Sequence, residues 1–347
     1  MSTFDQCSSP LALTGQAFDA LKSSPSDVFT MASVWSQPMV MRQLVADWPA
    51  VKVAQQGSRA FVDYLLAFDN HRTVDALELS HEENGRVFYN SDMTGFNFSR
   101  QRLPFQDALS KLLDLEAQSD PQSFYVGSTS VDACLPGFLS ENTLGQTTAN
   151  PLATLWIGNK SRIAAHYDVP DNVICVVSGK RKVTLFPPEQ AKNLYVGPLH
   201  VTPAGQAISL VDFHNPNFSQ FPKFKEAIKH ALVVELMPGD VLYIPSMWWH
   251  HIEGLDSVNT LVNFWWRDVP AHVGRPDNAL FHALLTIKQL PASQRAAWRH
   301  LFDHYVFDEN HSKNFEHIPS DKQGPLGTLD ENAFRQFSAW LQNSLKQ

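Results

Sequence analysis

The 347-residue sequence predicts a mainly β protein with helices (α+β), in which an N-terminal α/β segment and C-terminal helices flank a β-barrel. Short β-branched and aromatic runs, separated by turn residues, follow one another from about residue 155 to residue 266. Mixed strand and helix patterns precede these runs, and amphipathic helical stripes follow them. We therefore expect three parts, with residues 1–150 packed on a core of residues 151–270 and helices in residues 271–347.

Composition narrows the class of protein. Hydrophobic residues make up 44% of the chain and charged residues 18%, which is typical of globular proteins. No apolar run reaches the roughly 18 residues of a membrane span, and the first residues lack the pattern of a signal peptide. We expect a cytoplasmic protein with reduced thiols, because Cys7, Cys134 and Cys175 form no paired motif. The net charge of −8 disfavours a broad nucleic-acid surface, although a local basic groove remains compatible with it.

The N-terminal part is predicted to mix helices and strands. Residues 1 to about 30 show little periodicity and are expected to form an ordered arm or a frayed start of the chain. Residues 38–50 predict a short strand and then a helix that ends before Pro49, since the residue before a proline disfavours the helical conformation. The other elements expected here are helices at 59–68 and 105–115, strands at 74–79, 86–89 and 122–126, and a loop or short helix over 132–151.

The core is predicted from alternating and β-branched runs. The turn signal Ser178-Gly179-Lys180 separates two of them, so the flanking strands are expected to pair as a hairpin. Between residues 195 and 229 the pattern breaks, with prolines at 198, 203, 216 and 222, which favours a binding loop or lid with one short helix. The predicted core strands are 155–158, the segment around His166, 173–177, 181–186, 233–236, 240–244 and 260–266.

The C-terminal part shows helical stripes. Two helices are expected over residues 278–290 and from Ser293 to Tyr305, with Pro291 between them. Thr328 and Glu331 have the spacing of a capping box, which predicts the start of a last helix.

Spacing in the core predicts a metal site. Residues i and i+2 of a strand point to one face, so His166 and Asp168 can aim an imidazole and a carboxylate at one point. A third ligand must come from another strand, and the adjacent His250 and His251 are both candidates that would point to opposite faces. Two histidines and one carboxylate form the facial triad of non-haem Fe(II) oxygenases, which leaves three coordination positions open.

Several segments together resemble the JmjC and cupin-like Fe(II)/2-oxoglutarate hydroxylases, and among these the asparaginyl hydroxylase that acts on hypoxia-inducible factor. The resemblance is dense from about residue 156 to residue 266 and looser before it. It implies a double-stranded β-helix (jelly-roll) core, Fe(II) as the metal and 2-oxoglutarate as co-substrate. The segments that carry it are His166-Tyr167-Asp168, Thr184 to Pro188, Val211 to Pro216, Gly239 to His251 and Val262 to Trp265.

The resemblance also implies roles for individual residues. The first histidine after Trp-Trp binds the metal in the family, which selects His250, so that Ile252 shares its face. The family holds the far carboxylate of 2-oxoglutarate with a lysine, and Arg181 stands at the matching position, flanked by Lys180 and Lys182. A threonine three residues before the metal motif is replaced by Ile163, which removes one hydroxyl contact. The other residues expected at the co-substrate are Tyr125, Asn172, which we place on the same strand face as Asp168, Asn263 and Trp265.

The implied activity is hydroxylation of an unactivated C–H bond, with a protein side chain as the first choice of substrate. An Arg-Gln pair of the asparaginyl hydroxylase is replaced by Ala207-Ile208, so recognition of asparagine does not carry over. A small molecule or an RNA base are the alternative substrates, and a metal-binding cupin without oxygenase activity, acting as a binding protein, is the alternative class. The resemblance further implies a homodimer formed through the C-terminal helices.

Overall fold

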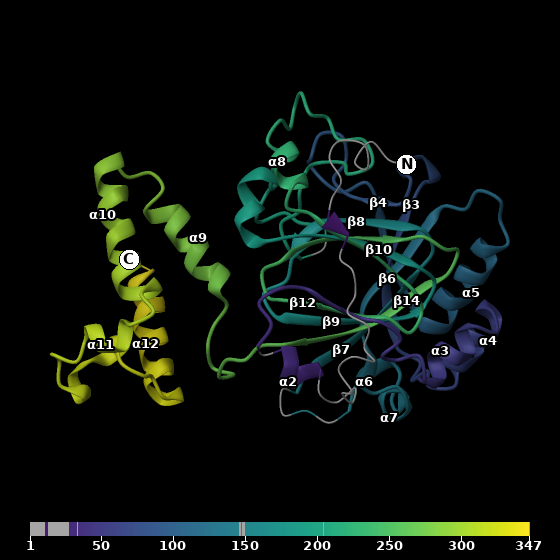
Figure 1. Ribbon diagram of the computed structural model, residues 1–347, viewed down its shortest axis with the longest axis horizontal. Coiled ribbons are helices and arrows are strands. Elements are labelled where there is room, and N and C mark those ends of the chain that lie inside the picture. Colours follow the sequence, from purple (N-terminus) through teal and green to yellow (C-terminus); the bar gives the residue numbers. More distant parts are fainter. Residues whose placement is uncertain are drawn as a thin grey trace. The chain divides into compact units, whose positions relative to one another are not determined.

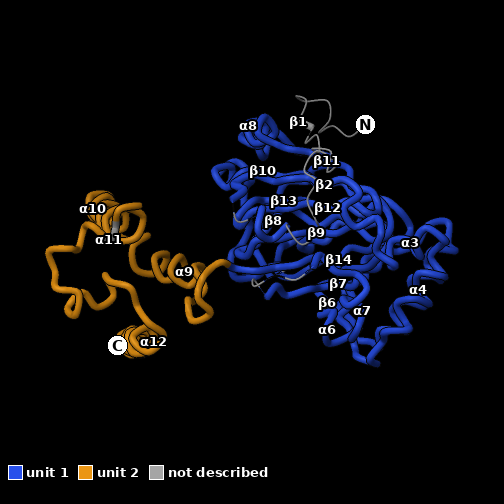
Figure 2. The backbone as a smooth tube through the Cα atoms, turned by 60° about the horizontal axis from the view of Figure 1, so that its bottom comes forward, with its two compact units in different colours: residues 1–267 blue, residues 268–347 orange. Residues whose placement is uncertain are grey.

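The chain divides into two units, residues 1–267 and 268–347 (Figure 2). The computed structural model describes residues 11–12, 28–32, 34–145, 147, 150–203 and 205–346. Most of the predicted N-terminal arm, with Cys7, lies outside these ranges. Residues from before and after position 150 share the first unit, because strands from both parts are built into the same two sheets.

Two mainly antiparallel sheets form the first unit (Figure 1). The six-stranded sheet has the order β1 (Leu11–Ala12), β11 (Leu232–Leu236), β10 (Arg181–Phe186), β13 (Trp249–Gly254), β8 (Ser161–Tyr167) and β4 (Arg86–Val87). The eight-stranded sheet has the order β2 (Met39–Met41), β12 (Val241–Ile244), β9 (Asp171–Ser178), β14 (Asn259–Trp266), β7 (Leu152–Gly158), β6 (Ser123–Ser130), β3 (Thr73–Leu79) and β5 (Ser99–Pro104).

Consecutive strands from β7 to β14 alternate between the two sheets, except that β10 and β11 pair with each other. This alternation is the double-stranded β-helix that the resemblance implied. The predicted hairpin around Gly179 is therefore wrong, because β9 pairs with β12 and β14 whereas β10 pairs with β11 and β13. Gly179, at φ +70°, lets the chain cross between the sheets, where a Cβ atom would lie 2.5 Å from the carbonyl oxygen of Val258.

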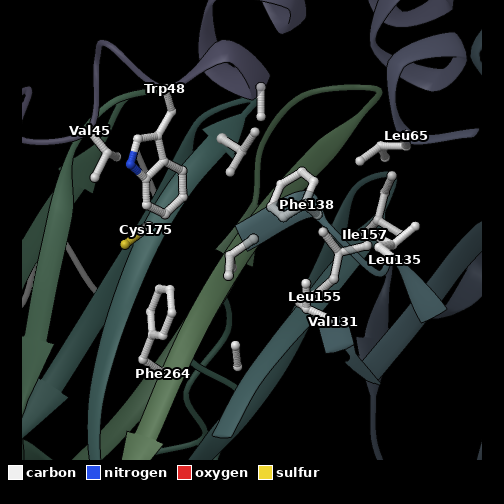
Figure 3. Close-up of a cluster of buried hydrophobic side chains, with 14 of the residues drawn as sticks. Val45, Trp48, Leu65, Val131, Leu135, Phe138, Leu155, Ile157, Cys175 and Phe264 are labelled. Atoms are coloured by element: carbon white, nitrogen blue, oxygen red, sulfur yellow. The ribbon is translucent and has the colours of Figure 1, made fainter. Parts of the chain in front are cut away.

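Alternating side chains on β9 separate two environments. Ile174 and Val176 point between the sheets and pack with side chains of β10 and β12. Val173 and Cys175 point the other way, into a large apolar layer. Figure 3 shows this layer, in which Trp48 lies between the strands and the helices that cover them. The period of two along each strand thus decides which residues reach the interior, where the functional cavity also lies.

The helices of the apolar layer come from the N-terminal part. The predicted helix ending before Pro49 is wrong, because residues 42–47 form turns and the helix starts at Pro49. A proline suits the first helical position, where its missing N–H would have no partner. The strand β5 was not predicted, since its sequence is polar and mostly exposed. The helices here are α2 (Val28–Ala32), α3 (Pro49–Ala54), α4 (Ser58–Leu66), η3 (His81–Glu83), α5 (Phe105–Glu116), α6 (Val131–Cys134) and α7 (Phe138–Glu141).

The outer face of the six-stranded sheet is covered by the segment between β10 and β11. It contains η4 (Pro188–Asn193) and α8 (Phe224–Ile228), which agrees with the predicted short helix. Phe224 and Ile228 of α8 pack against Phe186 and Trp249 of the sheet. The segment around Pro203 is irregular, as expected from its prolines.

The second unit is helical. Its last helix is capped by Asp330, whose side chain accepts a 2.7 Å hydrogen bond from the Ala333 N–H, so the predicted Thr328–Glu331 capping box is wrong. The second predicted helix starts one residue before Ser293, which is therefore not its cap. The elements are α9 (Pro276–Thr286), α10 (Ala292–Phe302), η5 (Asp303–Phe307), α11 (His311–Asn314), η6 (Ser320–Lys322), η7 (Gly324–Leu326) and α12 (Glu331–Ser344). Among the described residues, no helix is long and apolar enough to span a membrane.

Candidate metal centre and co-substrate cavity

Three side chains from neighbouring strands meet at one point inside the barrel. His166 on β8 and His250 on β13 are direct partners in the sheet register, and Asp168 follows the end of β8. Their ligand atoms all lie within 4.8 Å of one another. His250 Nε2 is 3.5 Å from Asp168 Oδ2. The structure therefore brings together the predicted triad, whose two imidazoles and one carboxylate suit a non-haem iron.

Backbone carbonyl groups orient both imidazoles. The Nδ1 atom of His166 lies 2.9 Å from the carbonyl oxygen of Ala164, and that of His250 lies 3.0 Å from the carbonyl oxygen of Trp248. A carbonyl oxygen only accepts, so each Nδ1 carries the proton. Each Nε2 then presents a lone pair, which is the form that binds a metal ion.

Burial keeps one of these histidines neutral. The pKa of His250 is lowered to about 4, first by burial and then by the neighbouring charge of His166. Asp168 acts in the opposite direction but does not offset these effects. The imidazole of His250 is thus ready for a metal ion at neutral pH without first losing a proton.

The two candidate histidines on β13 face opposite sides of the sheet. His251 is turned away from the triad and lies 3.6 Å from Glu253 and against the ring of Phe213. Only His250 of this pair lines the cavity that contains His166 and Asp168. The geometry thus leads to the same choice as the family resemblance.

Asp168 is held by two donors. The side-chain amide of Asn172 donates to Asp168 Oδ2 at 3.2 Å, and the indole of Trp265 donates to the same oxygen at 3.1 Å. Asn263 in turn donates to Asn172 at 3.1 Å. Asn172 does reach Asp168, but our reason was wrong, since it lies on β9 in the opposite sheet after a turn at residues 169–170.

All the predicted site residues line one cavity of about 320 Å³. This volume lies at the lower end of the range for small-molecule sites. The predicted residues in its wall are Tyr125, His166, Asp168, Asn172, Arg181, His250, Ile252, Asn263 and Trp265. Ile163 also lines it, at the position where the family has a threonine.

Arg181 places a charged side chain in the buried wall of the cavity. It is only 1% exposed, and its Nε and Nη2 atoms have no hydrogen-bond partner among the described residues. Burial lowers its pKa to about 10, and burial raises the pKa of nearby Tyr125 to about 12. A buried guanidinium with free N–H groups is suited to a carboxylate, which it binds through two parallel hydrogen bonds.

Sequence reasoning missed other residues of the cavity. Trp156 on β7 lines the cavity and bonds to Asn263. Thr154, two residues earlier on the same strand face, bonds to the same asparagine from behind the cavity wall, and strand alternation would have placed both side chains inside the barrel. Ile174 on β9 and Leu261 on β14 also line the cavity and were missed, although both strands were predicted. The other missed residues come from the N-terminal part and from the irregular segment, and no pattern in the sequence marked them. They are Asp75, Leu77, Val87, Arg100, Gly127, Ser128, Pro203 and Gly205.

The fold and this donor set define a cupin-type metal site, and the chain belongs to the cupin-like domain family, whose model matches residues 25–272. This confirms the predicted cupin-like, JmjC-type family and its jelly-roll core. The chain is similar to lysine-specific demethylase JMJ31 of Arabidopsis thaliana, with 32% identity over 148 residues, covering 41% of this chain and 25% of that protein.

Two further relatives match the same chain. It is 34% identical over 136 residues to HSPB1-associated protein 1 of Homo sapiens, covering 38% of this chain and 27% of that protein. It is 29% identical over 166 residues to tRNA wybutosine-synthesizing protein 5 of Mus musculus, covering 44% of this chain and 50% of that protein. The matched segments thus span a quarter to a half of the relatives' own lengths. Family and relatives support a JmjC-type, oxygenase-like enzyme.

Proposed function

We propose that this chain is an Fe(II)- and 2-oxoglutarate-dependent oxygenase that hydroxylates an unactivated C–H bond. The observation that carries the proposal is Arg181, a buried guanidinium whose Nε and Nη2 have no partner among the described residues, in the same cavity as the His-Asp-His triad. A metal-binding protein without a co-substrate has no use for this buried cation, which is costly to keep in an apolar interior. A dicarboxylate co-substrate offers a ligand for both the metal and the guanidinium.

Four residues of the cavity bind the metal and the co-substrate in this proposal. His166, Asp168 and His250 hold iron, and Arg181 holds the far carboxylate of 2-oxoglutarate. Iron and 2-oxoglutarate together supply the oxidising chemistry, in which O₂ is consumed and 2-oxoglutarate is converted to succinate and CO₂.

The apolar wall performs two further tasks. Ile252 and Leu261 line the cavity, where they would face the methylene groups of the co-substrate and exclude water from the reacting centre. Ile163 lines the same wall without a hydroxyl group, so recognition of the co-substrate depends more heavily on Arg181.

A protein side chain is our proposed substrate class. The cavity mouth carries opposite charges, Asp75 and Arg100, together with the hydroxyl group of Ser128. Such a rim can bond to the amide groups of a polypeptide. The relative named for synthesis of tRNA wybutosine makes an RNA base the second candidate. We rank it lower because the net charge of −8 does not favour a polyanion.

Anaerobic titration tests the proposal. The full chain is loaded with Fe(II), 2-oxoglutarate is added, and the visible metal-to-ligand charge-transfer band is recorded. We expect the band in the unaltered chain and its loss in His250→Ala. Iron binding without the band would favour the alternative class, a metal-binding cupin that acts as a binding protein.

We further propose that the chain is a homodimer formed through the second unit. Phe315 is its single buried hydrophobic residue among those whose burial is described. Trp340 on α12 is 59% exposed and Phe307 on η5 is 69% exposed. An 80-residue helical unit that buries so little of its apolar surface gains stability by covering that surface with a second copy of itself.

A further inference from the structure

A chain of hydrogen bonds crosses three adjacent strands and ends at the metal triad. The indole N–H of Trp156 on β7 donates to Asn263 Oδ1 at 2.7 Å, and the hydroxyl group of Thr154 also bonds to this oxygen. The Asn263 amide on β14 donates to Asn172 Oδ1 at 3.1 Å. The Asn172 amide on β9 donates to Asp168 Oδ2 at 3.2 Å. The strands β7, β14 and β9 are neighbours in the eight-stranded sheet.

The two asparagines of this hydrogen-bond chain, Asn172 and Asn263, are buried. Asn172 is 3% exposed and Asn263 is 2% exposed, so bulk water does not compete for their amide groups. The two ends of an asparagine side chain have nearly the same shape, and the neighbouring groups decide which end faces which way. A buried amide turned the wrong way leaves donors facing donors or acceptors facing acceptors, which is costly in a medium of low polarity.

The indole N–H of Trp156, at the end of the hydrogen-bond chain remote from Asp168, sets the direction of every hydrogen bond in it. An indole N–H can only donate, so Trp156 requires the oxygen of Asn263 to face it. The NH₂ group of Asn263 then faces Asn172, which must turn its own oxygen toward that group. The NH₂ group of Asn172 is left facing Asp168.

Thr154 supports the same direction. The Trp156 indole also lies 2.9 Å from the hydroxyl oxygen of Thr154, which can accept from it. The hydroxyl proton of Thr154 is then available to Asn263 Oδ1. Two donors therefore converge on one amide oxygen.

We propose that Trp156, assisted by Thr154, is a positioning residue of the metal centre. Through the fixed orientation of two asparagine amides it delivers an N–H group to Asp168. With the second N–H group from Trp265, this donor holds the Asp168 carboxylate in one rotation, ready for the metal ion. The inference rests on the metal centre of the proposed function.

The substitution Asn263→Asp keeps the shape of the side chain. It distinguishes the effect of amide orientation on metal binding from the effect of an added negative charge. In Asn263→Asp the carboxylate accepts from Trp156 and can only accept from Asn172 as well. Asn172 must then turn its NH₂ group toward residue 263 and its oxygen toward Asp168, where two oxygen atoms repel each other. The added negative charge alone would strengthen binding of a cation, whereas the hydrogen-bond chain predicts weaker binding.

The experiment measures Mn(II) affinity of the full chain by calorimetry, without 2-oxoglutarate. The test variants are Asn263→Asp, Trp156→Phe and the double variant Thr154→Val/Trp156→Phe. We expect Asn263→Asp and the double variant to bind about 10–100-fold more weakly, the range for loss of residues that orient metal ligands. Trp156→Phe should lose less, because the Thr154 hydroxyl group remains.

A matched control removes an indole on the other face of β14. Trp266 packs against the ring of Phe29 in the apolar layer, away from the cavity, so Trp266→Phe should bind Mn(II) as the unaltered chain does. The absorption spectrum of bound Co(II) provides a second readout, since it reports ligand geometry. We expect it to change in the double variant and to stay the same in Trp266→Phe. Thermal unfolding without metal identifies any variant that fails to fold.

Two results would overturn the inference in different ways. If the unaltered chain binds Mn(II) and Asn263→Asp binds it as tightly or more tightly, the amide orientation does not control the site. If the unaltered chain binds no metal, the metal centre of the proposed function fails, and this inference fails with it.

Discussion

Arg181→Met should stabilise the protein without its co-substrate and at the same time abolish co-substrate binding. Burial lowers the pKa of Arg181 from 12.5 to about 10. A difference of this size corresponds to roughly 3 kcal/mol by which the folded state disfavours the charged guanidinium. Methionine replaces the apolar part of the arginine side chain and carries no charge. We therefore expect the free energy of unfolding to rise by up to about 3 kcal/mol, in line with replacements of buried charges by apolar groups.

The pH dependence of stability follows from the same pKa difference and gives a second measurement of whether Arg181 is unfavourable to folding. Because the pKa is lower in the folded state, the unfolded chain binds the proton more tightly between pH 10 and 12.5. The contribution of Arg181 is therefore unfavourable at neutral pH and disappears as the pH rises through this window. Arg181→Met should remove that dependence.

Arg181→Met should weaken binding of the co-substrate, although it should stabilise the fold. Two charge-assisted hydrogen bonds contribute about 1.5–3 kcal/mol each, so their loss should weaken 2-oxoglutarate binding at least about 100-fold. Fe(II) binding should stay the same, because Arg181 is not part of the triad.

Denaturant unfolding and anaerobic calorimetry with 2-oxoglutarate measure the two effects. Lys180→Met is the matched control, since Lys180 is an exposed neighbour of the same charge. Unchanged stability together with unchanged 2-oxoglutarate affinity in Arg181→Met would refute the reasoning, and Lys180 or Lys182 would then be the candidate for the carboxylate.

Three other predictions concern the triad and the second unit. His166→Ala or Asp168→Ala should abolish iron binding, and unchanged metal content after purification with Fe(II) would exclude the triad. The pKa of His250 falls from 6.5 to about 4 on folding, so the unfolded chain takes up the proton first as the pH falls. The metal-free protein should lose about 3 kcal/mol of stability between pH 6.5 and 4 through this group; an identical acid dependence of unfolding in His250→Ala would contradict this. Trp340→Glu should shift a dimer toward monomer in sedimentation, with Lys346→Glu as the control for added charge, and an unchanged mass for Trp340→Glu would argue against self-association through α12.

The sequence allowed the core strands and two of the three triad residues to be predicted because these depend on local spacing. His166 and Asp168 are two residues apart near the end of one strand, and alternation alone places them on one face. The choice between His250 and His251 needed either a family resemblance or the structure. Strand pairing was harder: Gly179 marks a turn, but the same turn signal serves a hairpin and a crossing between sheets.

Helix ends were predicted less well than the helices themselves, because the signals overlap. Pro49 is compatible with a helix that ends before it and with one that begins at it, and the structure shows the second. Near the last helix, Thr328 and Asp330 are both good capping residues, and only the backbone decides that Asp330 caps it. The strand β5 escaped because exposed edge strands carry polar residues that resemble those of a loop.

The residues of the cavity wall come from two parts of the sequence. One part carries the residues proposed to bind the metal and the co-substrate, and the other carries residues that can contact the substrate. The triad, Arg181 and both asparagines lie on or beside β8, β9, β10, β13 and β14 of the double-stranded β-helix. Asp75, Arg100 and Ser128 lie on β3, β5 and β6, which extend the eight-stranded sheet beyond β7. Changes in these flanking strands can alter the rim without moving a metal ligand. Substrate specificity should therefore follow residues 73–130, and exchanging their side chains should change which substrate is bound while the affinities for iron and 2-oxoglutarate are retained.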